Sequence, residues 1–187
     1  MRSMVHPADS CGQYWFRFRA MLRPPGCGDT LRSMIEGKDF AVIQLSQLKW
    51  PTIQLASKRF RLFVAADVSD ISTEAISDFA LAALNHGMVY FCAWGPGCAR
   101  FHDIVDEVLL DDDLGERRFT GLDEDAVIMT TWHEHASLQE ALDFFATCAK
   151  PTDSFLVENS FRLVICVGNS DWAEAATRFL SEAERLV

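Results

Sequence analysis

The chain has 187 residues, of which 49% are hydrophobic and 24% are charged, and its formal net charge is −10. This length suits one domain with a sizeable core. No apolar stretch approaches the roughly 20 residues that a membrane span needs, and so acidic a chain repels phosphate backbones, so we expect neither a membrane nor a nucleic acid as partner.

The first 33 residues differ in charge from the rest of the chain. This segment is basic and sets five arginines against two aspartates: Arg2, Arg17, Arg19, Arg23 and Arg32 against Asp9 and Asp29. It contains the turn-rich stretch RPPGCGD and lacks the roughly 7–15-residue apolar core of a secretory signal. We predict a poorly ordered or loosely docked leader over residues 1–33 and a single α/β domain over residues 34–187. A natural start at Met34 is the alternative.

From residue 40 onwards, apolar runs alternate with amphipathic segments. A short run at 40–45 is a candidate strand, and four strand–helix pairs follow in chain order: 60–67 with 72–86, 89–94 with 98–110, 126–132 with 137–149, and 161–168 with 171–186. The runs are rich in Val, Ile and Phe and apolar on both faces, as in a buried parallel sheet. The pattern predicts an open, doubly wound, mostly parallel sheet of four to five strands in a three-layer α/β/α sandwich, Rossmann-like or flavodoxin-like.

Several helix ends have recognisable signals. Gly87 is expected to end the helix over 72–86, since glycine is common just after a helix. Ser137 and Glu140 form the S-x-x-E pattern of a capping box. Ser72 and Ser170 are also expected to act as N-caps, because a serine hydroxyl accepts a bond from a free backbone N–H in the first turn.

Polar and aromatic residues follow the carboxyl ends of the predicted strands, and in an open parallel sheet these ends share one edge where ligands bind. Glycine-rich turns at helix starts accept anions, and tryptophans stack on planar molecules. We therefore expect a ligand-binding edge made of nine residues: Asp67, Asp70, Trp94, Gly95, Gly97, Arg100, Trp132, Asn169 and Ser170.

Two pairs of residues at this edge suggest chemistry. Cys98 begins a predicted helix, where the thiolate is favoured, and His102 lies one turn later on the same face, so the two form a candidate nucleophile and base. His133 and His135 would point to one face of an extended strand and are candidate metal ligands. Neither pair matches a complete motif: a half-buried thiol with a surface imidazole, or a capping and a solvated histidine, explain them as well.

These observations leave three interpretations of function, of which the third is a structural or oligomerisation module whose exposed face is a helix. The favoured one is a non-catalytic domain that binds a small molecule or a protein partner at the carboxyl edge of the sheet, with a homodimer as one form of partner. The alternative is a hydrolase or transferase that uses Cys98 with His102, or a metal held by His133 and His135. No cofactor is predicted; flavin binding is compatible with the architecture alone.

The six cysteines indicate a reducing compartment. None forms a CxxC pair, and Cys92, Cys148 and Cys166 fall in apolar runs or on an apolar helix stripe, as small buried hydrophobes do. We therefore expect a cytoplasmic protein. The stretch FCAWGPGC…FHD resembles a signature of uncharacterised bacterial proteins, and this resemblance implies no activity.

Overall fold

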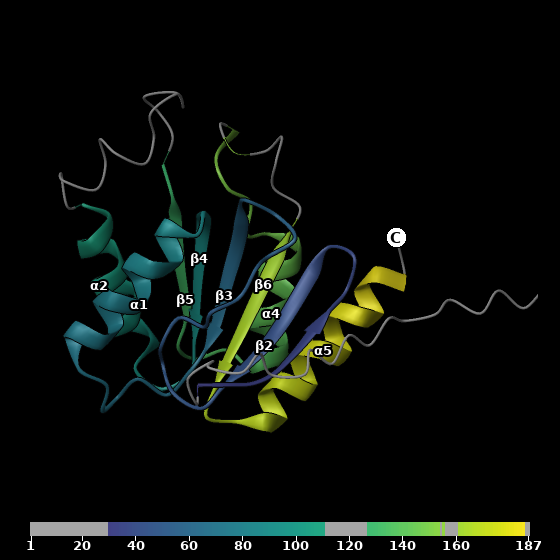
Figure 1. Cartoon of the computed structure of the whole chain (residues 1–187), viewed down its shortest axis with the longest axis horizontal. Coiled ribbons are helices and arrows are strands. Elements are labelled where there is room, and N and C mark those ends of the chain that lie inside the picture. Colours follow the sequence, from purple (N-terminus) through teal and green to yellow (C-terminus); the bar gives the residue numbers. More distant parts are fainter. Residues whose placement is uncertain (1–29, 111–126, 154, 156–160, 186–187) are drawn as a thin grey trace, which may run out of the picture.

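The computed structural model describes residues 30–110, 127–153, 155 and 161–185 of the chain. These residues form a six-stranded sheet with the order β1-β2-β6-β3-β4-β5 (Figure 1). The strands are β1 (Leu31–Glu36), β2 (Phe40–Leu45), β3 (Phe60–Ala65), β4 (Met88–Trp94), β5 (Met129–His133) and β6 (Arg162–Val167). Neighbouring strands run parallel, except that β1 pairs antiparallel with β2.

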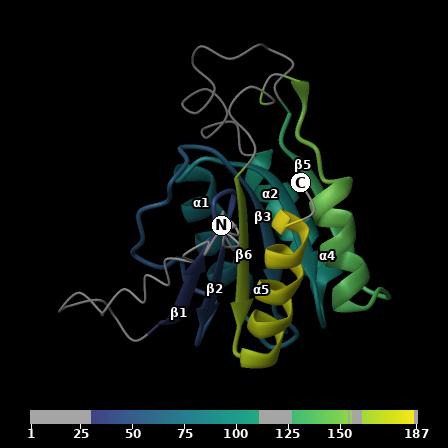
Figure 2. The same ribbon diagram turned by 90° about the vertical axis from the view of Figure 1, so that its right-hand side faces the viewer.

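Within the described ranges, two helices cover each face of this sheet. They are α1 (Thr73–Asn85), α2 (Cys98–Leu109), α4 (Leu138–Thr147) and α5 (Ser170–Arg185). Phe79 of α1 and Phe101 of α2 belong to one apolar core, and Phe145 of α4 and Leu180 of α5 belong to the other. Figure 2 shows α4 and α5 side by side on one face, with α1 and α2 beyond the sheet. The predicted three-layer α/β/α sandwich is confirmed.

The described residues contain six strands, not the four to five predicted. The added strand is β1, whose sequence LRSMIE is only partly buried because it lies at the edge of the sheet. An edge strand needs no continuous apolar run, so hydrophobicity alone does not reveal it. β1 begins inside the segment expected to be a leader; residues 1–29 of that segment lie outside the described residues.

The strand order differs from both folds named as expectations. Numbered along the chain, the five parallel strands have the order 1-5-2-3-4. The Rossmann order is 3-2-1-4-5-6 and the flavodoxin order is 2-1-3-4-5. Periodicity identifies strands but not their neighbours, and here the last strand, β6, inserts between β2 and β3.

The helix ends follow the local signals, with one exception. Ser72 Oγ accepts from Ala75 N at 3.2 Å, and Ser137 forms the predicted capping box with Glu140. In α5, however, Asn169 is the capping residue: its Oδ1 accepts from Asp171 N at 2.9 Å. Asn is as good a cap as Ser, and Ser170 is already the first residue of the helix.

The connection between β2 and β3 has no helix. Residues 46–59 run from the carboxyl end of β2 back to the start of β3, and their backbone is neither helical nor part of the sheet. Trp50, Ile53 and Leu55 of this connection pack against the core on the α1 side. An extended segment therefore lies beside α1, where a crossover helix would otherwise pack.

Candidate functional site

The parallel register places the predicted site residues at one edge of the sheet. Ala65, Trp94 and His133 end three neighbouring strands in register, and Val167 ends β6 one residue beyond Cys166, the partner of Ala65. Asp67, Cys98 and Asn169 follow three of these ends closely in the sequence. The carboxyl edge expected from the sequence therefore exists as a geometric feature.

Asp67 and Arg100 at this edge form hydrogen bonds with the loops around them. Asp67 Oδ1 accepts from Ser69 N at 3.0 Å, and this hydrogen bond lowers the pKa of the Asp67 carboxyl group. Arg100 donates from Nη1 to the carbonyl of Ile71 at 2.9 Å and from Nη2 to Thr73 Oγ1 at 3.1 Å. Asp70 and Ser170 are exposed. These groups stabilise loops and helix starts, and a ligand is not needed to explain them.

The Gly95-Pro96-Gly97 turn has a packing explanation. Gly95 has φ +112°, and a Cβ on it would overlap the carbonyl oxygen of Ala66. Gly97 has φ +75° and begins α2 without a side-chain cap. The Pro96 carbonyl accepts from Val68 N at 3.0 Å, so the turn after β4 is joined to the loop after β3. Glycine is present because the two backbones approach closely.

Cys98 does not have the properties of an activated nucleophile. Only 1% of it is exposed, and burial raises the pKa of its thiol although the backbone N–H of His133 opposes the shift. The expected lowering of this pKa is wrong, because desolvation of the thiolate outweighs the field of the helix start. Cys92 and Cys166 are buried as well, which raises the pKa of each to about 12. We call Cys92, Cys98 and Cys166 the buried thiols; Cys148, also expected inside, is exposed.

His102 bonds across to the edge strand instead of to the thiol. Its Nε2 lies 3.0 Å from Thr130 Oγ1, which donates to Asp106 Oδ1 at 2.7 Å, and its Nδ1 lies 3.2 Å from Asp103 Oδ1. Its ring packs against that of Trp132 at an interplanar angle of 48°, with centroids 4.3 Å apart. Both ring nitrogens therefore have partners: Nδ1 contacts Asp103 within α2, and Nε2 joins α2 to Thr130 of β5. The structure does not favour a Cys98–His102 pair.

The two candidate metal ligands do not converge. β5 ends at His133, whose ring lies 4.6 Å from that of Phe144 of α4, whereas the His135 side chain is 92% exposed beyond the strand. Burial lowers the pKa of His133. Within the described ranges, no three His, Cys, Asp or Glu side chains are grouped as a metal site requires. The expectation required the strand to continue to residue 135, but β5 ends at His133, so the prediction of a shared face is wrong.

The two strand-end tryptophans lie on opposite faces of the sheet. Trp94 Nε1 donates to the Ala136 carbonyl at 2.8 Å, and its ring meets that of Trp172 of α5 edge-on at 5.2 Å. Trp132 instead packs on His102 of α2. Trp94 therefore packs within the α5 layer and Trp132 within the α2 layer.

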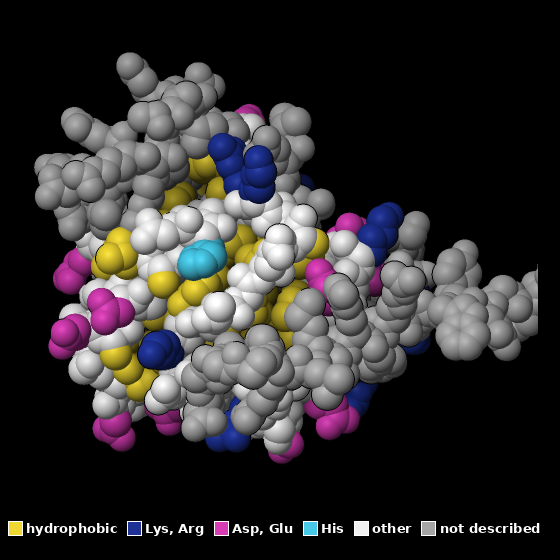
Figure 3. Space-filling model, in the orientation of Figure 1, with side chains coloured by type: hydrophobic (Ala, Val, Ile, Leu, Met, Phe, Trp, Pro, Cys, Tyr) yellow, Lys and Arg dark blue, Asp and Glu magenta, His cyan; other side chains and the backbone are white. Residues whose placement is uncertain are grey.

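A hollow of about 570 Å³ lies elsewhere, between α1 and the connection that follows β2. We call it the α1 groove. Figure 3 shows hydrophobic side chains gathered around a histidine in the middle of this face. Seven lining residues are apolar: Leu48, Trp50, Pro51, Ile53, Ala75, Phe79 and Ala82. Five are polar or charged: Gln47, Lys49, Thr52, Asp78 and His86.

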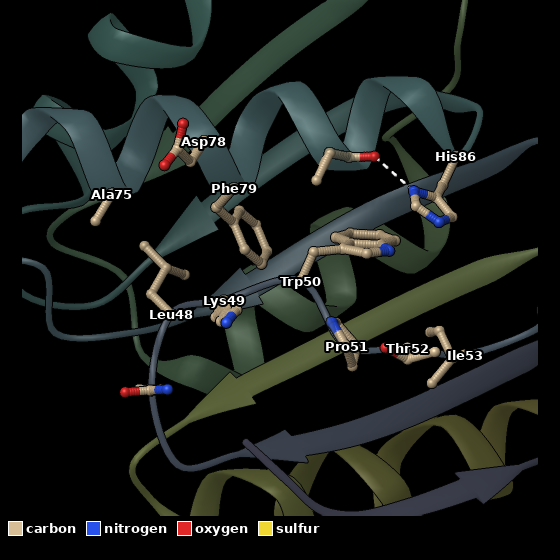
Figure 4. A pocket seen from close by; sticks show the side chains of 12 residues that line it. Leu48, Lys49, Trp50, Pro51, Thr52, Ile53, Ala75, Asp78, Phe79 and His86 are labelled. Atoms are coloured by element: carbon tan, nitrogen blue, oxygen red, sulfur yellow. Dashed lines mark hydrogen bonds between the residues drawn. The ribbon is translucent and has the colours of Figure 1, made fainter. Parts of the chain in front are cut away.

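Trp50 forms the floor of the α1 groove. Its ring lies 5.8 Å from Phe60, 5.6 Å from Phe79 and 5.1 Å from His86, centroid to centroid. Figure 4 shows Phe79 and His86 projecting from α1 towards this ring. The indole Nε1 is buried without a hydrogen-bond partner. Aromatic packing thus holds the connection against α1, and the groove is formed before any ligand arrives.

His86 supplies a polar group at one end of the groove. Its Nδ1 lies 2.7 Å from the Ala82 carbonyl (Figure 4). A carbonyl oxygen can only accept, so Nδ1 donates, and in that neutral tautomer Nε2 is the acceptor nitrogen. Lys49 and Asp78 bring opposite charges to the lining. The groove therefore offers an apolar floor, one imidazole acceptor and little net charge.

The sequence contains the residues of the groove but no signal that unites them. Lys49-Trp50-Pro51 is typical of a break after a strand, because proline disfavours regular structure before it. Phe79 and Ala82 fit the apolar stripe of a helix. The one hint is a tryptophan in a stretch without periodicity, and its neighbours are known only once the chain has folded.

The fold and these sites define an α/β sandwich with a mostly parallel sheet and an open groove on one face. Residues 40–183 match the family described as "Domain of unknown function (DUF7684)", and the chain belongs to that family. No curated protein sequence matches the chain. Among the described helices, none is both long and apolar enough to cross a bilayer.

Proposed function

We propose that this domain is a binding module that takes a small, planar, largely apolar molecule into the α1 groove. The observation that carries the proposal is the preformed hollow of about 570 Å³ with Trp50, Phe79 and His86 in its lining. Pockets for small molecules are typically about 300–1,000 Å³, mostly apolar, with few polar groups. The groove fits that description better than the carboxyl edge, where the polar side chains are already engaged by the loops.

The lining indicates the chemistry of the ligand. An aromatic ring can stack on the exposed part of Trp50, and a donor on the same ligand can reach Nε2 of His86. Because Lys49 and Asp78 offset each other in charge, a neutral molecule suits the groove better than an ion. A neutral aromatic molecule with one N–H or O–H donor is the class that we infer.

The probe N-phenyl-1-naphthylamine, a neutral aromatic amine, tests this proposal by fluorescence titration. We expect enhanced, blue-shifted emission with the full chain. Ala82→Met should weaken binding at least tenfold, because Ala82 lines the groove and a longer side chain fills it. The matched control is Ala175→Met, a half-buried helical alanine outside the groove lining. Equal binding by both variants, or no binding either by the unaltered chain or by the variant Trp15→Ser/Phe16→Ser/Phe18→Ser, would refute the proposal.

We also propose that the partner, if it is a protein, is a second copy of this chain paired along β5. β5 ends the sheet order, and the large exposed hydrophobic residues of the described chain lie on this strand or beside it: Leu110, Val127, Met129 and Trp132. Antiparallel self-pairing about Thr131 would oppose Met129 to His133 and Thr130 to Trp132. The strand MTTWH has no acidic or basic pair to repel its own copy.

Light scattering tests this pairing. The unaltered chain should show a dimer mass at micromolar concentration, and Met129→Lys should give a monomer, because a lysine on an edge strand opposes pairing. Asp143→Lys, at an exposed position of α4, is the control and should leave the dimer intact. A monomer mass for the unaltered chain at every concentration would exclude the dimer.

The thiols of the described cysteines are free, which supports our further proposal of a reducing, cytoplasmic compartment.

A further inference from the structure

The chain enters the described fold beside the α1 groove. Thr30 is buried, and its carbonyl accepts from Ser46 N at 2.7 Å. Gln47 Nε2 donates to Thr30 Oγ1 at 3.3 Å, and Gln47 is itself a lining residue of the groove. Whatever precedes Thr30 therefore starts at one end of this hollow.

The preceding segment has the composition that the groove accepts. Residues 14–22 read YWFRFRAML, with aromatic residues at 14, 15, 16 and 18. Residues 23–29, RPPGCGD, separate this stretch from Thr30 and are rich in turn-forming residues. A docked segment needs apolar anchors and a connection that can reverse direction, and both are present in the sequence.

The connection is long enough. Seven residues span at most about 24 Å when extended. The lining of α1 runs from Ala75 to His86, a length of about 16 Å along the helix axis. The aromatic stretch can thus reach any part of the groove without displacing Thr30.

Charge also favours an encounter between the segment and the rest of the chain. Residues 1–29 hold four arginines and two aspartates, a formal charge of +2 in a chain of net charge −10, so the remainder carries −12. Asp78 lines the groove and Glu74 lies one turn before it on α1. Arg17 and Arg19 alternate with the aromatic residues of the segment. Opposite charges on the two parts attract each other and raise the local concentration of the segment.

We propose that residues 14–22 of this chain dock in the α1 groove, with aromatic side chains on Trp50 and an arginine beside Asp78. The inference rests on the groove of the proposed function and makes the segment an internal competitor of the small molecule. A tethered segment binds as an intramolecular partner, so weak contacts suffice to occupy the site.

The test compares the labelling of two histidines by diethyl pyrocarbonate in the full chain, read by mass spectrometry. His135 is exposed beyond β5 and serves as the internal reference, while His86 lies in the groove. In the unaltered chain, His86 should react at least threefold more slowly relative to His135 than in the variant Trp15→Ser/Phe16→Ser/Phe18→Ser. The control Met4→Ser/Val5→Ser alters the same leader outside the aromatic stretch and should leave the ratio unchanged.

The outcomes separate this inference from the proposed function. The quantity compared is the rate of His86 labelling divided by that of His135, called the His86 ratio. An equal His86 ratio in the unaltered chain and the triple variant overturns the docking, even if the naphthylamine probe binds. A raised ratio in the triple variant supports the docking, even if the probe binds neither protein and the proposed function fails. A His86 ratio that rises as the protein is diluted overturns docking within one chain, because it shows that the segment of another copy covers the groove.

Discussion

Replacing Trp50 by alanine should remove the contact that holds the connection after β2 against α1. The indole packs on the rings of Phe60, Phe79 and His86. A fully buried tryptophan costs about 3–5 kcal/mol on truncation, and each aromatic pair adds roughly 0.5–1.5 kcal/mol beyond its buried area. Trp50 is half-buried, so we expect a loss of about 2–3 kcal/mol in the free energy of unfolding.

Urea unfolding followed by circular dichroism measures this loss. A thermal melt checks it: for a chain of this size, 1 kcal/mol corresponds to roughly 2–4 °C in Tm, so Tm should fall by about 4–12 °C. Trp132→Ala is the matched control. Trp132 is 48% exposed and its ring packs at a tilt on His102, so the same truncation should cost only about 1 kcal/mol.

A double-mutant cycle refines the prediction. Trp50→Ala and His86→Ala should be coupled by about 0.5–1.5 kcal/mol, because the two rings are in contact. The reasoning is refuted if Trp50→Ala costs no more than Trp132→Ala, or if the coupling with His86→Ala is zero. Either result would mean that contacts between these rings do not hold Trp50, the floor of the α1 groove, in place.

Three further predictions concern groups that the structure places in defined surroundings. Iodoacetamide should label Cys148 in the native protein and reach the buried thiols only after unfolding, by peptide mass spectrometry; fast labelling of a buried thiol would contradict its burial. Burial lowers the pKa of His133 in the fold, so the unfolded chain binds the proton more readily and stability should fall as pH drops through about 6.5. His133→Asn should reduce that loss in urea titrations at about pH 7.5 and 5.5, whereas His135→Asn, at an exposed position, should not. Gly95→Ala should lower the free energy of unfolding by about 3 kcal/mol, and Gly168→Ala by about 1 kcal/mol. Both glycines have positive φ, but only a Cβ on residue 95 would meet backbone atoms, those of Ala66. Equal shifts in Tm would argue against that close approach.

The sequence alone determined most elements and the layers. Apolar runs over 40–45, 60–67, 89–94 and 161–168 correspond to β2, β3, β4 and β6, because strands buried on both faces need continuous apolar sequence. The capping box at Ser137 could be predicted from the sequence, because it depends on two residues three positions apart along the chain. The strand predicted over 126–132 is observed as Met129–His133, so it is shorter and begins later in the chain. Residue 126, and residue 186 at the predicted end of the last helix, lie outside the described residues.

Only the tertiary structure decided which elements are neighbours and what their side chains meet. The insertion of β6 between β2 and β3 depends on contacts far apart in sequence, which no local pattern encodes. The same holds for the pKa of the Cys98 thiol, which burial raises although the residue begins a helix. It also holds for His102 of α2, which contacts Thr130 of β5 instead of the thiol. Trp50 lies in a stretch without periodicity, and it becomes the floor of a groove only when α1 packs beside it. Local hydrogen bonds and hydrophobic periodicity act within a few residues, whereas pockets and pKa values are set by whatever the fold brings within a few ångströms.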